Sequence, residues 1–184
     1  MPVRFQWTEL SNFADAAAED YFRDSSLKLL TGVGASLSRS TFDNRMRPTR
    51  ATLTKLSVEQ VGALGGDFSF TAFHADEKVF IPVLEDILGR RTVLQVSSKL
   101  SYIPQGPGST PVYERFMLGG QSLRGFDYRG VSPRGIRHDN GQLGGDPVGG
   151  NFSFFLGTEL QQPLYEDIFA LAVFVDSGTV NQRF

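Results

Sequence analysis

Several short motifs in this chain resemble pieces of catalytic sites, but none of them is complete. The run Gly120-Gln121-Ser122-Leu123 continues with Arg124, whereas a G-x-S-x-G nucleophile elbow requires glycine at that position. Gly32-Val33-Gly34 lacks the third glycine of a dinucleotide loop, and no G-K-[ST] follows it. His74 and His138 stand in no metal-binding spacing, and the chain has no cysteine. We therefore expect no catalytic, cofactor-binding or metal-binding residues, and we predict that the protein is not an enzyme.

A different chemistry is indicated by residues 114–126, which read Glu-Arg-Phe-Met-Leu-Gly-Gly-Gln-Ser-Leu-Arg-Gly-Phe. Gly119 and Gly120 allow a sharp backbone path, and the run Leu123-Arg124-Gly125-Phe126 follows them. A guanidinium is a planar fork of N–H donors that binds carboxylates in a bidentate manner. With such partners Arg124 could hold a long loop in one place, whereas an interior arginine without partners is costly.

Two acidic residues are suitable partners for Arg124. Glu159 lies on the polar side of an alternating stretch, and Asp176 lies opposite the bulkier side of the last apolar stretch. Because successive side chains of a strand point to opposite faces, both carboxylates would point into the interior if these stretches form a barrel. Glu159 and Asp176 are therefore two candidate partners that the guanidinium of Arg124 could bind.

The elements that position these residues are predicted to be β-strands, because apolar and polar residues alternate with a period of two. Most of the stretches are longer than the roughly 5–6 residues of an ordinary strand. Most have about 9–12 residues, which matches the roughly 9–11 residues that a tilted strand needs to cross a bilayer. On this pattern alone a soluble β-sandwich and a membrane barrel are about equally favoured. The six stretches are residues 29–39, 50–61, 67–72, 91–102, 151–160 and 168–175.

Two regions do not alternate. Residues 11–24 begin with Ser11 as a suitable N-cap, are rich in alanine and acidic residues, and predict a short helix. Residues 104–150 are rich in glycine and proline, have no sustained period, and predict a long loop. Such a loop is uncommon in a compact domain, whereas outer-membrane barrels have long loops on one side and short turns on the other. The turns at Pro82–Gly89 and Pro163–Asp167 are compact, as this asymmetry requires.

The composition excludes several classes of protein. The 184 residues include 18 Lys and Arg against 20 Asp and Glu, and these basic residues are scattered, which argues against a nucleic-acid surface. A mean hydropathy of −0.17 excludes a helical membrane protein, and 40% hydrophobic residues exclude a disordered chain. No signal peptide is visible. These values alone would predict a soluble cytoplasmic domain, but alternating barrel strands have low hydropathy too.

Four segments, in order along the chain, resemble motifs of the BamA-type outer-membrane assembly factors, the bacterial surface antigen superfamily of barrel insertases and translocators. Leu123-Arg124-Gly125-Phe126, behind Gly119 and Gly120, resembles the family's [V/L]-R-G-[F/Y] loop tip. Residues 174–180, which include Asp176 and Gly178, resemble its F-x-D-x-G-x-V strand. Residues 149–163, which include Glu159, resemble its G-G-N…E…P strand. Residues 39–50 resemble its R-D-x-x-D-N…P-T-R-G segment, but Ala51 replaces the final glycine and residues 40–42 replace acidic residues that are common there. The matches extend over residues 27–180.

The resemblance implies an all-β fold, an antiparallel transmembrane β-barrel of about sixteen strands. This chain would be an incomplete arc of about six strands, with a short helix near its N-terminus. Residues 1–184 would form one partial barrel domain, in which the loop of residues 104–150 enters the lumen and brings Arg124 to Asp176 and Glu159. The chain would be a C-terminal barrel fragment in the bacterial outer membrane, and its missing signal peptide would reflect truncation.

The implied function is the folding and insertion of other β-barrel proteins into the outer membrane. Expected partners are outer-membrane lipids, unfolded outer-membrane clients, accessory lipoproteins and periplasmic chaperones, with no nucleic acid and no cofactor. Three alternatives stay open: a two-partner-secretion or translocation-module transporter, a passive porin-like barrel, and a soluble β-rich binding domain.

Overall fold

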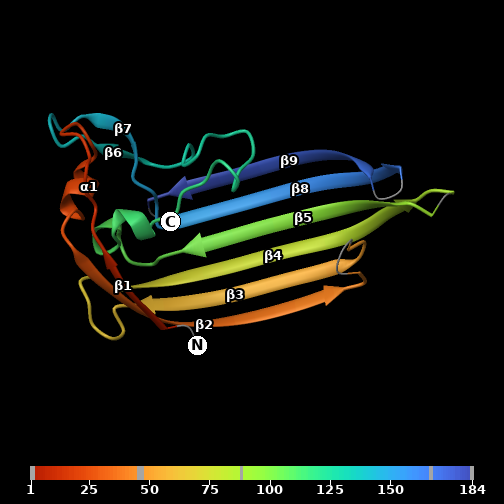
Figure 1. The fold of residues 1–184 in the computed structure, drawn as a ribbon, viewed down its shortest axis with the longest axis horizontal. Helices are drawn as coiled ribbons and strands as arrows, with labels where there is room; N and C mark the ends of the chain where they lie inside the picture. The colour runs from red at the N-terminus through yellow and green to blue at the C-terminus, as the bar shows by residue number, and fades with distance from the viewer. Residues whose placement is uncertain (1–2, 45–47, 88, 166–167, 183–184) are drawn as a thin grey trace.

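A curved sheet of seven antiparallel strands dominates the fold (Figure 1). The computed structural model describes residues 3–44, 48–87, 89–165 and 168–182. The strand order is β1-β2-β3-β4-β5-β8-β9, so every strand of this sheet pairs with its neighbour along the chain except where β6 and β7 intervene. Its strands are β1 (Val3–Thr8), β2 (Lys28–Phe42), β3 (Ala51–Val61), β4 (Phe70–Glu85), β5 (Arg91–Tyr102), β8 (Phe152–Tyr165) and β9 (Phe169–Asn181).

The predicted antiparallel β-class is confirmed, and the differences concern the number and length of the strands. β5 begins and ends where the alternation predicts, whereas the prediction omits β1 altogether. β4 extends far beyond the predicted residues 67–72 and includes part of the predicted turn at Pro82–Gly89. Its alternation is interrupted because Glu77 lies on the otherwise apolar face, while the hydrogen-bonded ladders with β3 and β5 continue past that position.

The helix is much shorter than predicted. α1 (Glu19–Arg23) covers only the end of the predicted range 11–24, and its N-cap is Ala18 rather than Ser11. Ala18 donates its backbone N–H to the Asp146 carboxylate at 2.9 Å, so a contact with a distant segment sets the start of the helix. None of the helices in the described part of the chain combines the length and the apolar character of a membrane span.

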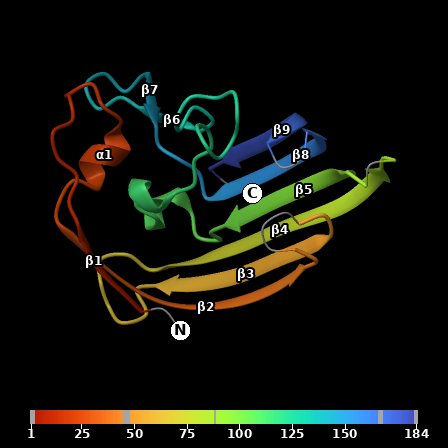
Figure 2. The same cartoon turned by 45° about the vertical axis from the view of Figure 1, so that its right-hand side comes forward.

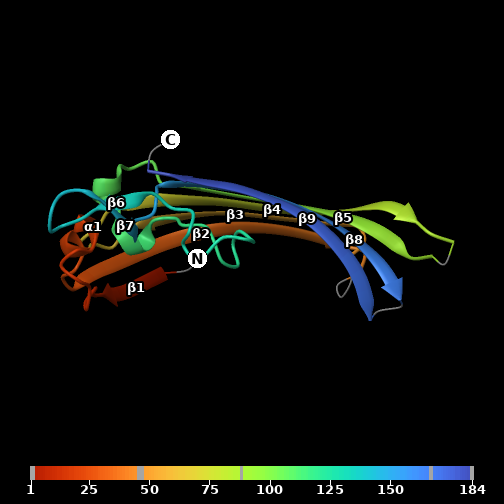
Figure 3. The same cartoon turned by 90° about the horizontal axis from the view of Figure 1, so that it is seen from above.

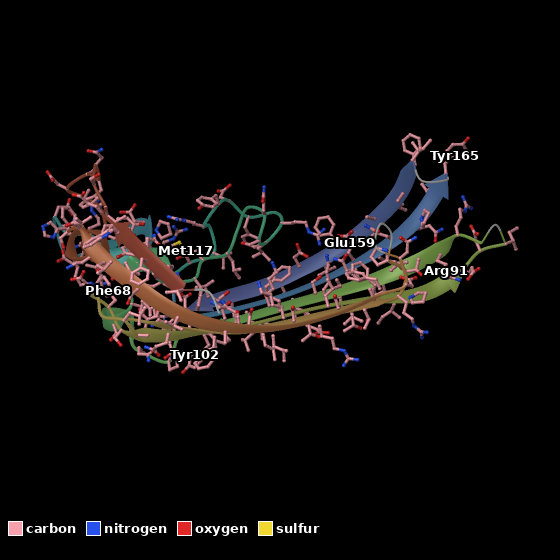
Figure 4. All side chains as sticks on the ribbon, turned by 60° about the horizontal axis from the view of Figure 1, so that its bottom comes forward. Phe68, Arg91, Tyr102, Met117, Glu159 and Tyr165 are labelled. Atoms are coloured by element: carbon pink, nitrogen blue, oxygen red, sulfur yellow. The ribbon has the colours of Figure 1, made fainter. Side chains whose placement is uncertain are left out.

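The two faces of the sheet differ in chemistry. On the concave face a row of directly paired residues, Lys55, Asp76 and Lys99, crosses β3, β4 and β5. On the convex face many large apolar side chains are exposed, among them Leu37, Leu56 and Leu100. Figure 3 shows the curvature that separates the faces, and in Figure 4 Glu159 lies on the concave side and Tyr102 on the convex side. The alternation of each strand therefore divides polar from apolar surface.

The two ends of the sheet also differ. Two connections at one end are long, residues 9–27 and 103–151, whereas the third at that end, residues 62–69, is no longer than residues 43–50 at the other end. At the other end β2 and β3, β4 and β5, and β8 and β9 are joined by short turns (Figure 1). Long loops at one end and short turns at the other are typical of outer-membrane barrels.

The longest connection folds over the concave face at the long-loop end (Figure 2). It is predicted as one loop, but it contains two single-turn helices and a separate two-stranded sheet. Beside it lies the main hydrophobic cluster, built from Leu30, Val61, Phe70, Ala72 and Ile103. The short elements are η1 (Pro107–Ser109), η2 (Val112–Glu114), β6 (Arg134–Ile136) and β7 (Leu143–Pro147).

Asp43, in the turn after β2, is expected to titrate at an unusually low pH. Its carboxylate accepts hydrogen bonds from the Thr49 hydroxyl and the backbone N–H groups of Asn44, at 2.9 Å, and Thr49, at 3.0 Å. Together with a backbone hydrogen bond from Arg50, these donors lower the pKa of Asp43 to about 2, from an ordinary value of 3.8. Because the pKa of Asp43 is lower in the folded state, these hydrogen bonds stabilise the turn fully at a pH above its ordinary pKa. That stabilisation is lost as the pH falls towards 2.

An NMR titration of the Asp43 carboxyl carbon should give a midpoint near 2, and Thr49→Ala should move that midpoint upwards. A midpoint at the ordinary value in the unsubstituted protein would contradict the hydrogen-bonded turn.

Candidate functional site

The candidate site is the contact between the tip of the long loop and the concave wall. Arg124 donates from Nε to Asp176 Oδ2 at 2.7 Å and from Nη2 to Asp176 Oδ1 at 2.8 Å, which makes a bidentate pair. Its Nη1 donates to Glu159 Oε2 at 2.6 Å. The structure thus brings together the three charged residues that sequence analysis grouped, and one guanidinium binds both carboxylates.

The sheet register explains why the two carboxylates lie side by side. Glu159 on β8 pairs with Phe174 on β9, and Gly157 pairs with Asp176, so the two acids occupy neighbouring positions on the same face. The side chain of Asp176 is only 4% exposed and that of Glu159 15%, against 39% for Arg124. The wall therefore holds two shielded negative charges, and the loop supplies the positive charge that compensates them.

Phe174 is a further contact of Arg124 that sequence analysis did not identify. The guanidinium carbon lies 3.5 Å from the centre of the Phe174 ring, a cation–π contact. The signal was present, because Phe174 stands two residues before Asp176 and so shares its face. Hydrogen bonds to Asp176 and then to Glu159 raise the pKa of Arg124, so its charge is fixed and the contact does not respond to physiological pH.

The loop tip depends on glycines at sharp backbone positions. Gly119, Gly120 and Gly125 have positive φ angles of 124°, 60° and 85°. A Cβ atom on Gly119 would lie 2.0 Å from the carbonyl oxygen of Asp127, whereas one on Gly125 would meet nothing within 4 Å. Gly119 is therefore required by a close approach of the backbone as well as by its φ angle.

The two apolar residues that flank Arg124 have different environments. Leu123 is buried in a cluster with Leu118, Phe155 and Val180, whereas Phe126 is exposed. Gly178 leaves space for this cluster, because a Cβ atom there would lie 2.8 Å from Leu118 Cδ1. The tip thus combines an apolar anchor with an ion pair.

The base of the loop is bound by charged residues that sequence analysis left without roles. Glu114 accepts two hydrogen bonds from Arg4 of β1, at 3.0 and 3.1 Å, and Arg4 also lies 3.0 Å from Glu59 of β3. Next to Glu114, the side chain of Arg115 is 1% exposed and donates to the carboxylate of Asp20 in α1 at 2.9 Å.

α1 makes further contacts with the loop. The buried carboxylate of Asp24, directly after the helix, accepts the backbone N–H of Val112 at 2.8 Å. The Tyr21 hydroxyl donates to the carbonyl oxygen of Pro147 at 2.7 Å. The connection between β1 and β2 therefore fixes the base of the loop, while β8 and β9 fix its tip.

A cavity of about 680 Å³ lies between the loop tip and the wall. Its lining includes Lys55, Asp76, Lys99 and Gln121 beside the Arg124 contact. Within the described ranges, no group of three or more His, Asp or Glu side chains could hold a metal ion. The ion pairs of Arg124 hold the loop against the wall. Beside them, a cavity with a polar lining lies on the concave side of the sheet.

Comparison with known proteins identifies relatives over nearly the whole chain. A family model described as the Omp85 superfamily domain matches residues 1–183. The chain is 28% identical over 174 residues to outer membrane protein assembly factor BamA of Nitratidesulfovibrio vulgaris, covering 92% of this chain and 21% of the relative. It is 30% identical over 149 residues to BamA of Neorickettsia risticii, covering 80% of this chain and 18% of the relative. A sorting and assembly machinery component 50 homolog of Bos taurus is 25% identical over 191 residues, which cover 95% of this chain and 36% of the relative.

A solved structure supports the same fold. The crystal structure of BamA from Haemophilus ducreyi lacking POTRA domains 1–3 matches with a TM-score of 0.67 and 22% identity, over 84% of this chain and 30% of that one. The predicted fold, an arc of an antiparallel barrel, and the predicted family resemblance are confirmed. The chain spans 18–36% of the length of the curated relatives named above, and those relatives are named as assembly components rather than as enzymes.

Two glycine substitutions distinguish the effect of a positive φ angle in the loop tip from the effect of a close backbone approach. Gly125→Ala should destabilise the tip by about 1–2 kcal/mol through its positive φ alone. Gly119→Ala should cost more, because its Cβ atom would also collide with the carbonyl of Asp127. Protease cleavage of the loop measures both effects, and equal cleavage of the two variants would contradict the close approach at Gly119.

Removal of the buried arginine at the loop base is expected to be costly. Arg115→Met removes the donor to two backbone carbonyls and leaves the Asp20 carboxylate with its Arg23 pair, and each buried acceptor left without a donor costs about 1–3 kcal/mol. Hydrogen exchange of residues 110–118 should become markedly faster. Arg137→Met, which removes an exposed pair with Asp139, is the matched control and should change little. Similar exchange in both variants would show that the base does not depend on Arg115.

Proposed function

The chain belongs to the Omp85 superfamily, and on this premise we propose that it is part of a bacterial outer-membrane barrel that folds and inserts other β-barrel proteins. The observation that carries the proposal is the loop tip bound by Arg124 to Asp176 and Glu159, in a chain whose relatives include proteins named outer membrane protein assembly factor. We propose residues 1–184 as one partial barrel domain, with residues 104–150 as the lumen loop.

The surface of the sheet supports a membrane location. The convex face has an apolar groove lined by Leu37, Leu56, Phe73, Leu100 and Tyr102, several of which are strongly exposed. Lipid chains cover such a band in an outer-membrane barrel, while the opposite face stays wet. Lipids of the outer membrane are therefore proposed as the partner of the convex face.

The proposed mechanism needs no covalent chemistry. A client strand in a membrane must satisfy its backbone N–H and C=O groups, since each unpaired group costs several kcal/mol in hydrocarbon. An open strand edge in the complete barrel can pair with the client by strand addition. Arg124, Leu123 and the glycines of the tip act as positioning residues that join the loop to β8 and β9 and keep that part of the wall in one shape. Accessory lipoproteins and periplasmic chaperones are proposed as further partners.

A transport function is the second candidate, and the polar cavity beside the loop tip favours it. In a two-partner-secretion or translocation-module transporter, or in a passive porin-like barrel, this cavity would belong to the conducting path. The two candidates differ in experiment: a transporter conducts ions in planar bilayers without affecting client insertion, whereas an insertase is required for client insertion.

Charge reversal tests the role proposed for Arg124. In the complete protein, Arg124→Glu places a third negative charge beside Asp176 and Glu159 and should strongly reduce the insertion of a client barrel into membranes. Asp176→Arg in the same molecule should restore part of the activity by reversing the ion pair. The measurement is the fraction of a heat-modifiable client barrel that folds in proteoliposomes.

The matched control is Arg124→Lys, which keeps the charge but loses the bidentate fork and should give an intermediate activity. Full activity of Arg124→Glu would overturn the positioning role. If Arg124→Glu leaves insertion intact but changes ion conductance, the transport function is supported instead.

A further inference from the structure

A six-residue pattern occurs twice, once in each of two neighbouring hairpins. Residues 82–87 read Pro-Val-Leu-Glu-Asp-Ile, and residues 163–168 read Pro-Leu-Tyr-Glu-Asp-Ile. The first copy ends β4 and the second ends β8, both at the short-turn end of the sheet. In the second copy Glu166 and Asp167 lie outside the described residues.

The two prolines occupy equivalent places in the sheet. The pairing of β3 with β4 ends at Phe80, and the pairing of β5 with β8 ends at Gln161, so each proline comes two residues after the last pair on one side. Beyond that point each hairpin is a two-stranded ribbon with an open edge. Because proline has no N–H group, it blocks further strand pairing along that edge.

A β-bulge follows each proline. In the first hairpin Pro82 pairs with Val93 and Leu84 with Thr92, so Val83 is the extra residue. In the second, Pro163 pairs with Ala170 and Tyr165 with Phe169, so Leu164 is extra. A bulge puts two residues opposite one and re-aims a side chain. Val83 and Leu84, and likewise Leu164 and Tyr165, are each at least half exposed.

These residues continue the apolar convex face beyond the regular sheet. By register Leu84 follows Ile81 on that face, and Tyr165 lies opposite Phe169. Ion pairs accompany the apolar residues at the first turn: Arg90 binds Asp86 at 2.7 Å and Arg91 binds Glu85 at 3.0 Å. Figure 1 shows the β4–β5 hairpin projecting beyond its neighbours, and Figure 4 shows Tyr165 at the tip of β8.

A direct contact joins the two turns. The guanidinium of Arg90, in the turn that follows the first copy, donates to the backbone carbonyl of Leu164 in the second copy. The Thr92 hydroxyl donates to Gln162 between them. The apolar residues of both copies are therefore presented together rather than as two independent tips.

We propose that the two repeated turns are a paired anchor that inserts Val83, Leu84, Leu164 and Tyr165 into the boundary between headgroups and acyl chains of one leaflet. This inference rests on the proposed membrane location. Lipid is the occupant that fits, because Leu84 and Tyr165 lie on the convex apolar face by register and the first turn ends at charged pairs. The proline of each copy ends strand pairing with the neighbouring hairpin. The bulge that follows it places two apolar side chains, instead of one, on the outer face.

Depth-dependent quenching tests the anchor in the complete barrel reconstituted in phosphatidylcholine vesicles. Single cysteines replace Leu84, Leu164, Val173 or Leu143 in an otherwise cysteine-free protein, and each carries an environment-sensitive fluorophore. Val173 lies on the convex face of β9, and Leu143 is an equally apolar, exposed residue of β7 at the other end. Labels at 84 and 164 should be quenched several-fold more by shallow than by deep lipid quenchers, the label at 173 by deep ones, and the label at 143 by neither.

The outcomes separate the anchor from the proposed function. Water-exposed labels at 84 and 164, together with a lipid-exposed label at 173, overturn the anchor and leave the membrane location intact. A water-exposed label at 173 contradicts the membrane location itself, and the anchor with it. Labels at 84 and 164 that become shielded only after periplasmic proteins are added would identify a protein-binding surface and also overturn the anchor.

Discussion

The guanidinium of Arg124 compensates two carboxylates that are shielded on the concave wall, and this electrostatic requirement fixes the position of the loop. Asp176 and Glu159 lie on adjacent strands and face the same side, so without a cation the two carboxylates would repel each other. The loop cannot leave the wall unless both carboxylates lose their partner. Leu123 adds an apolar contact beside the ion pair, so displacement of the tip would also expose buried hydrophobic surface.

The loop is held at two places by two different parts of the sheet. At its base Glu114 binds Arg4, and Arg115 binds Asp20, so the first strand and the connection after it determine where the loop begins. At its tip Arg124 binds β8 and β9. A movement of either part of the sheet would therefore strain the loop between them. The loop is therefore fixed to the concave face at both its base and its tip.

Features that depend on a regular strand pattern or on a short motif could be predicted from the sequence. The period of two placed Glu159 and Asp176 on the inner face, and the ordered motifs identified Arg124 as their partner. Contacts between segments far apart in the chain could not be predicted, because nothing near Arg4 or Asp20 indicates that Glu114 and Arg115 are their partners. The environments of Leu123 and Phe126 also required the structure, since two apolar neighbours of an arginine look equivalent in sequence. β4 was underestimated because the charged residues along it hide the alternation.

We propose that the loop tip stays bound to the inner wall when the complete barrel lies in a bilayer. Gln121 beside the tip and Ser97 on β5 line the same cavity, so spin labels on Gln121→Cys and Ser97→Cys report directly on this contact. Double electron–electron resonance in proteoliposomes should give one short and narrow distance distribution. A broad distance distribution, or one centred at a much longer distance, would show instead that the tip leaves the wall.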